Sequence, residues 1–167
     1  PGADHWIDAR DLPDDQEALA DAVIERSRQA MVDEIRQVPF GVYENSMRID
    51  GYEQEVDLVA KMTIGEDGID VDFTGTSGVS SRGINVPLSY TQAYASFGIR
   101  CVVGSQVPNN AGSLAPVCVS APKGSILNAQ PPRAVAARHV IGQMLPDVAL
   151  GCLYQAVPER VPAEGSS

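Results

Sequence analysis

The sequence predicts an α+β domain, and two observations predict it. Three segments of alternating apolar residues lie close together between about 42 and 73, with tight-turn residues between them, which is typical of an antiparallel β-meander. Segments with apolar residues three and four positions apart lie on both sides of the meander, which is typical of amphipathic helices. We therefore expect helices over about 15–38, 87–103 and 134–157 to pack against a small antiparallel sheet.

Composition excludes several classes of partner. The 167 residues are 44% hydrophobic and 20% charged, which is ordinary for a globular domain. The formal net charge of −10 and the aromatic content of 5% argue against nucleic acid and membrane partners, which need basic or stacking surfaces. Cys101, Cys118 and Cys152 form no CxxC pair and lie in apolar runs. We expect buried, reduced thiols in a cytoplasmic protein.

The first helix has clear signals at both ends. We expect residues 1–14 to be an extended segment and 15–167 to form a single α+β domain. Asp14 can cap the helix, with Glu17 three residues later, and Val38-Pro39 ends it. One face of this helix is marked by Leu19, Val23, Ile24, Met31, Ile35 and Val38.

The meander contains three predicted strands. Gly51 and Glu66-Asp67-Gly68 mark its turns. The alternating apolar positions begin at Tyr43, Val56 and Ile69 and run to Ile49, Ile64 and Phe73. Carboxylates that alternate along a strand usually form a solvated face, and we assign that role to Asp70. Asp72 lies next to the following loop and is the better candidate for a catalytic role or for holding loop N–H groups.

A loop rich in glycine and hydroxyl groups follows the third strand. It contains Thr74, Gly75, Thr76 and Ser77, and it closes near Asn85, where a new helix can begin. Such a loop between a strand and a helix can bind an anion or polar ligand through its N–H and hydroxyl groups. From this stretch alone, a long polar connection is the simpler interpretation.

Two further helices are predicted after this loop. Tyr90, Tyr94, Phe97 and Cys101 have helical spacing, and we interpret them as a core stripe. A short buried strand is expected over 116–120.

The last helix is expected to be broken or kinked at Pro146. His139, Gln143 and Asp147 form a polar line four residues apart on this helix. Buried polar groups need partners, and a ligand is one such partner, but an amphipathic helix with a satisfied histidine explains the same pattern.

The motifs of several enzyme classes are missing. The sequence has no Walker A loop, no GxSxG elbow and no HExxH pair. Its two histidines, His5 and His139, are too distant for a metal site, so we assign no metal ligands.

Five blocks in register resemble the hydantoinase B/oxoprolinase family over about 15–167. They are Asp72-Phe73-Thr74-Gly75-Thr76-Ser77, Ile84-Asn85-Val86-Pro87, Val107-Pro108-Asn109-Asn110-Ala111-Gly112, Ala121-Pro122-Lys123-Gly124-Ser125-Ile126-Leu127-Asn128 and Pro131-Pro132-Arg133-Ala134-Val135. Val161-Pro162-Ala163-Glu164-Gly165 resembles a family segment that normally continues, and the chain begins at Pro1 without a methionine. We therefore expect a fragment of a larger hydantoinase B chain.

The resemblance implies part of the B component of an ATP-dependent enzyme. Members open cyclic amides such as hydantoins or 5-oxoproline, or, as related carboxylases, add bicarbonate to ketones. An A-type partner binds ATP and activates the small-molecule substrate by phosphorylation, and an oligomer is expected. Family metal ligands come from a His/Asp-rich region that has no match here. The resemblance thus implies no cofactor bound by this chain, ATP through the A component, and a divalent metal only from a missing part.

The resemblance also suggests roles for individual residues. The loop at 74–78 would supply donors to an anionic intermediate. His139 would transfer a proton and Asp147 would orient it or pair with Arg138. Substrate-binding roles fall to Thr74, Gly75, Thr76, Ser77, Asn85, Asn110, Arg138 and Gln143, although loop asparagines often only stabilise turns.

Three functions follow as alternatives. The first is part of the B component of a cyclic-amide hydrolase, with an isolated fragment that is inactive. The second is part of the B component of a biotin-independent, ATP-dependent ketone carboxylase. The third is a non-catalytic assembly module, which is favoured if Thr74, Asn85, Asn110 and His139 scatter instead of converging on one cleft and the apolar patches are exposed.

Overall fold

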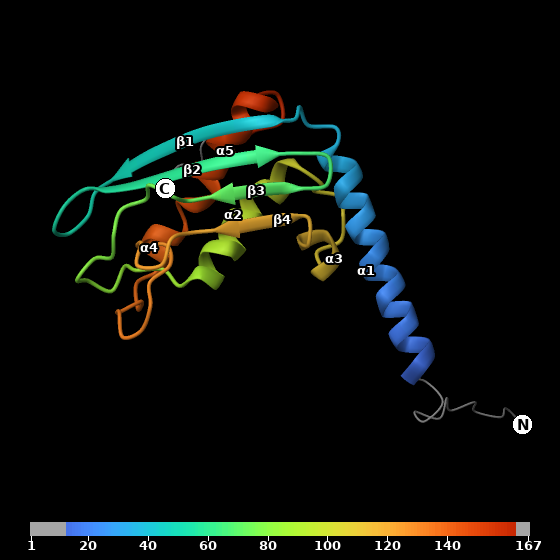
Figure 1. Cartoon of the computed structure of the whole chain (residues 1–167), viewed down its shortest axis with the longest axis horizontal. Helices are drawn as coiled ribbons and strands as arrows, with labels where there is room; N and C mark the ends of the chain where they lie inside the picture. Colours follow the sequence, from blue (N-terminus) through green and yellow to red (C-terminus); the bar gives the residue numbers. More distant parts are fainter. Residues whose placement is uncertain (1–12, 163–167) are drawn as a thin grey trace, which may run out of the picture.

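A four-stranded sheet lies at the centre of the computed structural model, which describes residues 13–162 (Figure 1). β1 (Gly41–Ile49), β2 (Val56–Ile64) and β3 (Ile69–Asp72) are antiparallel neighbours. β4 (Val117–Ser120) pairs in parallel with β3, so the strand order is β1-β2-β3-β4. The α+β class and the antiparallel meander are confirmed, and the short strand near 116–120 proves to be a fourth, parallel member of the sheet.

The alternation of the meander fixes which face of the sheet is buried. Tyr43, Met62, Val71 and Val119 lie opposite one another in register across the four strands. Met62 and Val71 are fully buried, whereas Lys61 and Asp70 are exposed on the other face. Because side chains alternate between the two faces of a strand, one register places the whole apolar set on the core side.

Two helices cover the buried face. α2 (Leu88–Val102) and α5 (Leu145–Ala156) pack against each other, α5 contacts β1 and β2, and α2 contacts β4. α3 (Ala111–Leu114) and α4 (His139–Gly142) are single turns at the edges of this layer. Within residues 13–162, no helix has the length and apolar character needed to cross a membrane.

The first helix is only half packed. The C-terminal end of α1 (Pro13–Ile35) is attached to the body of the domain, and the N-terminal half of the helix projects away from the body (Figure 1). Met31 and Ile35 are fully buried, but Leu19 is 65% exposed and Val23 is 50% exposed. The expected apolar stripe is therefore only half in the core, because α3 contacts the middle of the helix, near Ile24 and Arg28, and the turns before Ile24 extend beyond it. The extended segment expected before the helix lies almost entirely outside the described residues.

The predicted core stripe of α2 is wrong. Tyr90 and Tyr94 are only partly buried and stack on each other, and Phe97 and Cys101 are exposed. The buried face instead consists of Thr91, Ala95, Ser96, Gly98, Ile99 and Val102. A face of small residues allows α5 to approach closely: a Cβ at Gly98 would lie 2.6 Å from the Cα of Pro146.

The expected helix over 134–157 is two helices, and residues 133–138 are not helical. The break lies just before Pro146, which occupies the first turn of α5, where a missing N–H leaves no hydrogen bond unmade. His139, Gln143 and Asp147 are therefore not aligned on one continuous helix. His139 begins α4, Gln143 follows it, and Asp147 lies in the first turn of α5.

Candidate functional site

The turn after β3 is organised by Asp72. Its Oδ1 accepts hydrogen bonds from the backbone N–H of Thr74 at 2.9 Å and from Thr74 Oγ1 at 2.7 Å. Gly75 follows with a φ of +98°, a conformation that side chains rarely adopt. Asp72 thus orders the start of the glycine-rich loop by holding its N–H and hydroxyl groups.

Thr76 and Ser77 attach this loop to β2. Thr76 Oγ1 accepts from the N–H of Val59 at 3.0 Å, and Ser77 Oγ accepts from the N–H of Asp57 at 2.9 Å. The N–H of Ser77 in turn donates to the carbonyl of Asp57 at 2.9 Å. Through these hydrogen bonds the loop runs alongside β2 and pairs with its backbone. Thr74 and Gly75 remain exposed at the tip of the loop.

Asn85 is a buried connector. Its side chain has 0% exposure. Its Oδ1 accepts from the N–H of Ser80 at 2.8 Å, and its Nδ2 lies 2.9–3.0 Å from the carbonyls of Ser80, Arg82 and Ala134. One amide group therefore closes the loop over 80–85 and joins it to the segment before α4.

The same loop is fastened to the turn between β1 and β2. Ser80 Oγ donates to Glu53 at 2.8 Å, and Ser81 Oγ also donates to the Glu53 carboxylate. The hydrogen bond from Ser81, and to a smaller extent that from Ser80, holds the pKa of Glu53 below its ordinary value, because both stabilise the charged carboxylate.

Arg138 and His139 lie beside this loop. The N–H of Ala137 donates to the carbonyl of Gly83 at 2.8 Å, which places the start of α4 against it. The Arg138 guanidinium lies 5.4 Å from the ring centroid of Tyr90 and donates to the carbonyl of Val135. Arg138, His139 and Gln143 are exposed. Tertiary structure therefore brings Asn85 and Arg138 into one region.

Asn110 lies elsewhere and caps α3. Its Oδ1 accepts from the N–H groups of Gly112 and Ser113, and its Nδ2 donates to Ser27 Oγ of α1 at 2.8 Å. Asp147 lines a shallow cavity of about 480 Å³ with Asn45 and Tyr154. The candidate residues thus occupy the loop region, α3 and α5 and do not share one cavity, while large apolar side chains such as Phe97 are exposed. This is the arrangement that was expected to favour the assembly module.

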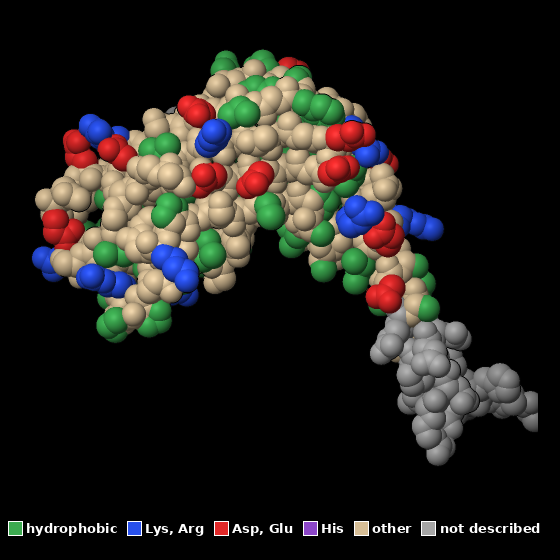
Figure 2. Space-filling view, in the orientation of Figure 1, with side chains coloured by type: hydrophobic (Ala, Val, Ile, Leu, Met, Phe, Trp, Pro, Cys, Tyr) green, Lys and Arg blue, Asp and Glu red, His purple; other side chains and the backbone are tan. Residues whose placement is uncertain are grey.

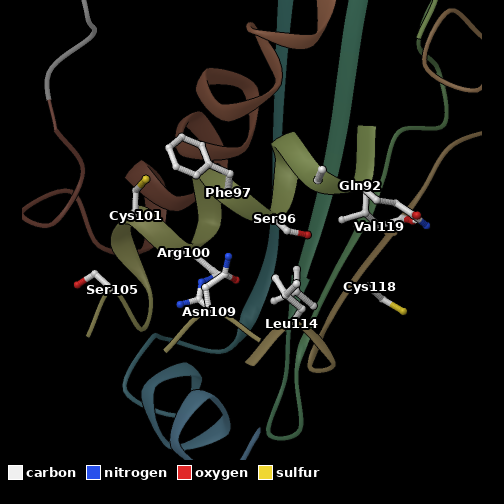
Figure 3. A pocket seen from close by; sticks show the side chains of 12 residues that line it. Gln92, Ser96, Phe97, Arg100, Cys101, Ser105, Asn109, Leu114, Cys118 and Val119 are labelled. Atoms are coloured by element: carbon white, nitrogen blue, oxygen red, sulfur yellow. Dashed lines mark hydrogen bonds between the residues drawn. The ribbon is translucent and has the colours of Figure 1, made fainter. Parts of the chain in front are cut away.

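A larger cavity lies between α2, α3 and β4 (Figure 3). Its volume is about 740 Å³, and apolar side chains such as Phe97, Leu114 and Val119 line it. No candidate residue from the sequence lines this cavity. In the sequence, the indication of this cavity is the apolar pair Phe97 and Cys101, which lie one helical turn apart on α2. Their spacing predicts a core position, but both are exposed and line the cavity.

Arg100 is the charged residue of this cavity. Its guanidinium donates to Ser113 Oγ and to the carbonyl of Val107, which ties α2 to α3. These acceptors are neutral, and none of the ion pairs among the described side chains includes Arg100. In the described part of the chain, the cavity therefore carries a positive charge with no carboxylate partner.

Two of the three cysteines contradict the expectation of buried thiols. Cys101 and Cys118 are exposed and line the larger cavity, because each lies on the outward face of its element. Cys152 is buried against β2, and burial raises its pKa to about 11.

We expect iodoacetamide to modify Cys101 and Cys118 at pH 8 while Cys152 stays unmodified. About 0.1% of a thiol with a pKa near 11 is ionised at that pH, and burial also blocks access. Intact-mass spectrometry over time checks the result, with protein unfolded in guanidinium as the control that accepts three labels. A third label on the folded protein at the rate of the first two would contradict the expectation.

Metal coordination has no visible basis in the described part of the chain. Among the side chains that the structure describes, no three or more of His, Cys, Asp or Glu are placed together to hold an ion.

Comparison with known proteins shows which family the chain belongs to. The family model "Hydantoinase B/oxoprolinase" matches residues 11–167, and the chain belongs to this family. It is 32% identical over 164 residues to the B subunit of a "Putative D-/L-hydantoinase" from Pseudomonas sp. (strain NS671). That alignment covers 90% of this chain and 28% of the relative.

Two other proteins extend the comparison. "5-oxoprolinase 1" of Arabidopsis thaliana is 39% identical over 80 residues, which is 47% of this chain and 6% of that protein. The crystal structure of the ATP-dependent caprolactamase from Pseudomonas jessenii superimposes with a TM-score of 0.81 and 25% identity, over 90% of this chain and 27% of that one. The chain therefore spans about a quarter of the length of the hydantoinase and caprolactamase chains that it matches over 90% of its own length.

Proposed function

We propose that this chain is part of the B component of an ATP-dependent cyclic-amide hydrolase, which opens rings such as hydantoins or 5-oxoproline together with an ATP-binding A-type component. The observation that carries the proposal is family membership over residues 11–167. The similarity to an ATP-dependent caprolactamase supports it, since caprolactam is itself a cyclic amide.

The chemistry explains why two components would act together. An amide carbonyl is a poor electrophile, and phosphorylation of its oxygen by the A component creates a good leaving group. The resulting anionic species is stabilised by donors that are already oriented. In this chain, Arg138 is the best placed donor: it is exposed, and Tyr90 orients its guanidinium. We propose that Arg138 pairs with a carboxylate or phosphate and that His139 transfers a proton.

The remaining candidates receive supporting or contact roles in this proposal. Asp72, Thr76, Ser77 and Asn85 hold the loop that borders Arg138, and Asn110 holds α3. Thr74, Gly75 and Gln143 are exposed and contact substrate, while Asp147 contributes a charge at the start of α5. ATP enters through the A component, and any divalent metal is held outside residues 13–162.

A chimera tests the proposal. Residues 11–167 replace the matching segment of the Pseudomonas hydantoinase B component, which is co-expressed with its A-type partner. We expect ATP hydrolysis that depends on added hydantoin or 5-oxoproline, and an Arg138→Gln chimera with at least about tenfold lower kcat/KM, the loss of one charge-assisted contact. Arg48→Gln, at an exposed arginine paired with Asp57, is the matched control and should retain activity.

Two results separate the alternatives. ATP turnover that requires a ketone and bicarbonate would reject the hydrolase and favour the carboxylase. A chimera that assembles with the A component, turns over cyclic amides, and is indifferent to Arg138→Gln and His139→Gln would reject the residue roles and favour the assembly module. The isolated chain is expected to be inactive, and turnover by the chain alone would contradict a dependence on other parts.

A further inference from the structure

The middle of the chain carries no acidic residue. Residues 73–146 contain no Asp or Glu, and their basic residues are Arg82, Arg100, Lys123, Arg133 and Arg138. The ion pairs among the described side chains all use basic residues from other parts of the chain. The cations of residues 73–146 therefore have no carboxylate partner among the side chains that the structure describes.

Two of these arginines lie on segments that one buried side chain joins. The Asn85 side chain donates to the carbonyl of Arg82 at 2.9 Å and to the carbonyl of Ala134 at 3.0 Å. Arg133 directly precedes Ala134 in the chain. Because neighbouring Cα atoms are only about 3.8 Å apart, the backbones of Arg82 and Arg133 lie close together, although 51 positions separate them in the sequence.

Arg138 is attached to the same region by another hydrogen bond. The N–H of Ala137, one residue before Arg138, donates at 2.8 Å to the carbonyl of Gly83, one residue after Arg82. Arg82, Arg133 and Arg138 are all exposed. Figure 2 shows Lys and Arg side chains gathered at the lower left of the molecule, where Figure 1 places the orange segment that leads into α4. We refer to these three residues as the arginine cluster.

The guanidinium groups of the cluster keep most of their N–H donors free. The Cζ of Arg82 lies 5.9 Å from the ring centroid of Tyr52, and that of Arg138 lies 5.4 Å from the ring centroid of Tyr90. Contact with a ring face restricts a guanidinium without using its N–H groups. Arg138 donates to one backbone carbonyl, whereas Arg82 and Arg133 donate to described residues only through their backbone N–H groups.

The Glu53 carboxylate also reaches this region, but hydroxyl groups occupy it. Ser80 donates to one of its oxygens at 2.8 Å, and Ser81 donates to the other. Among the described side chains, Glu53 forms no ion pair with Arg82. Three positive charges against one negative charge leave the region positive, so it can attract an anion from outside the chain.

We propose that Arg82 and Arg133 act together with Arg138 to bind a phosphate group. That this group belongs to the activated substrate rests on the proposed function. A phosphate carries about two negative charges at neutral pH and several acceptor oxygens, whereas a carboxylate carries one charge and two oxygens. Each guanidinium can contact two phosphate oxygens at once. Three guanidinium groups in one region therefore match a phosphate better than the single carboxylate of a substrate.

Titration of the isotope-labelled 167-residue chain with inorganic phosphate, followed by NMR, tests the binding site. We expect saturable shifts of the amide signals of residues 80–85 and 133–138. Arg82→Gln and Arg133→Gln should each weaken binding at least about threefold, and the double variant at least about tenfold, because each removes a charge-assisted contact. Lys61→Gln is the matched control: it removes the same charge from an exposed position on β2 and should leave the dissociation constant unchanged.

Three results of the titration would overturn the proposal. The first is the absence of saturable shifts in these two segments up to about 50 mM phosphate. The second is acetate that binds as tightly as phosphate at equal ionic strength, which would favour a carboxylate. The third is Lys61→Gln that weakens binding as much as Arg82→Gln, since the effect would then come from net charge alone. Circular dichroism verifies that each variant is folded.

The chimera separates this proposal from the proposed function. In an active chimera, Arg82→Gln and Arg133→Gln should each lower kcat/KM at least about threefold, and inorganic phosphate should inhibit the unmodified chimera more strongly than either variant. An active chimera that is indifferent to both substitutions would reject the arginine cluster and leave the hydrolase assignment intact. A chimera that is inactive, although the chain binds phosphate at the cluster, would support the binding site and count against the hydrolase assignment.

Discussion

Replacing Asn85 with alanine is expected to lower the free energy of unfolding by about 2–4 kcal/mol. The substitution removes the acceptor of the Ser80 N–H and the donor to three carbonyls, in a position with 0% exposure. Water cannot easily replace these partners there, so the groups lose hydrogen bonds without regaining solvent. Urea unfolding followed by circular dichroism measures the change.

Asn109→Ala is the matched control for Asn85→Ala. Asn109 is exposed and makes no side-chain hydrogen bond within residues 13–162, so its loss should change stability by less than about 0.5 kcal/mol. Equal effects of the two substitutions would show that Asn85 does not connect the loop to the segment before α4. A functional consequence also follows, because the loop held by Asn85 borders Arg138: in the chimera, Asn85→Ala should reduce turnover as well as stability.

Gly98→Ala is expected to destabilise the fold by about 1–3 kcal/mol, although alanine favours a helix over glycine by about 1 kcal/mol. A Cβ at this position would lie 2.6 Å from the Cα of Pro146 and 3.0 Å from its Cβ and carbonyl oxygen. Backbone atoms cannot rotate away, so α2 and α5 would have to separate. Thermal and chemical unfolding of the variant measure the cost.

The control for this prediction is Gly78→Ala. A Cβ at Gly78 would meet no atom within 4 Å, and Gly78 does not have a positive φ. That variant should therefore be about as stable as the original protein. If Gly98→Ala raised the melting temperature instead, helix propensity would outweigh close packing. The need for small residues between α2 and α5 would then not explain why the aromatic side chains of α2 lie outside the core.

Local signals determined part of the candidate site. Asp72 was expected to hold loop N–H groups, and it does so because the accepting carboxylate and the donor Thr74 are only two residues apart. The larger cavity was not foreseen, since its walls come from α2, α3 and β4, whose adjacency depends on the crossover that places β4 beside β3. The catalytic and binding roles assigned to individual residues remain predictions.

By itself, the sequence determined the α+β class, the three antiparallel strands, the break near Pro146 and the family. Each of these depends on neighbouring residues or on short motifs, which act over one turn or one hairpin. Tertiary structure alone decided which helical faces are buried. α1 and α2 both carry a regular apolar stripe, yet half of one and the end of the other lie outside the core. Periodicity shows that a face is apolar, but burial depends on whether another element is close enough to cover it.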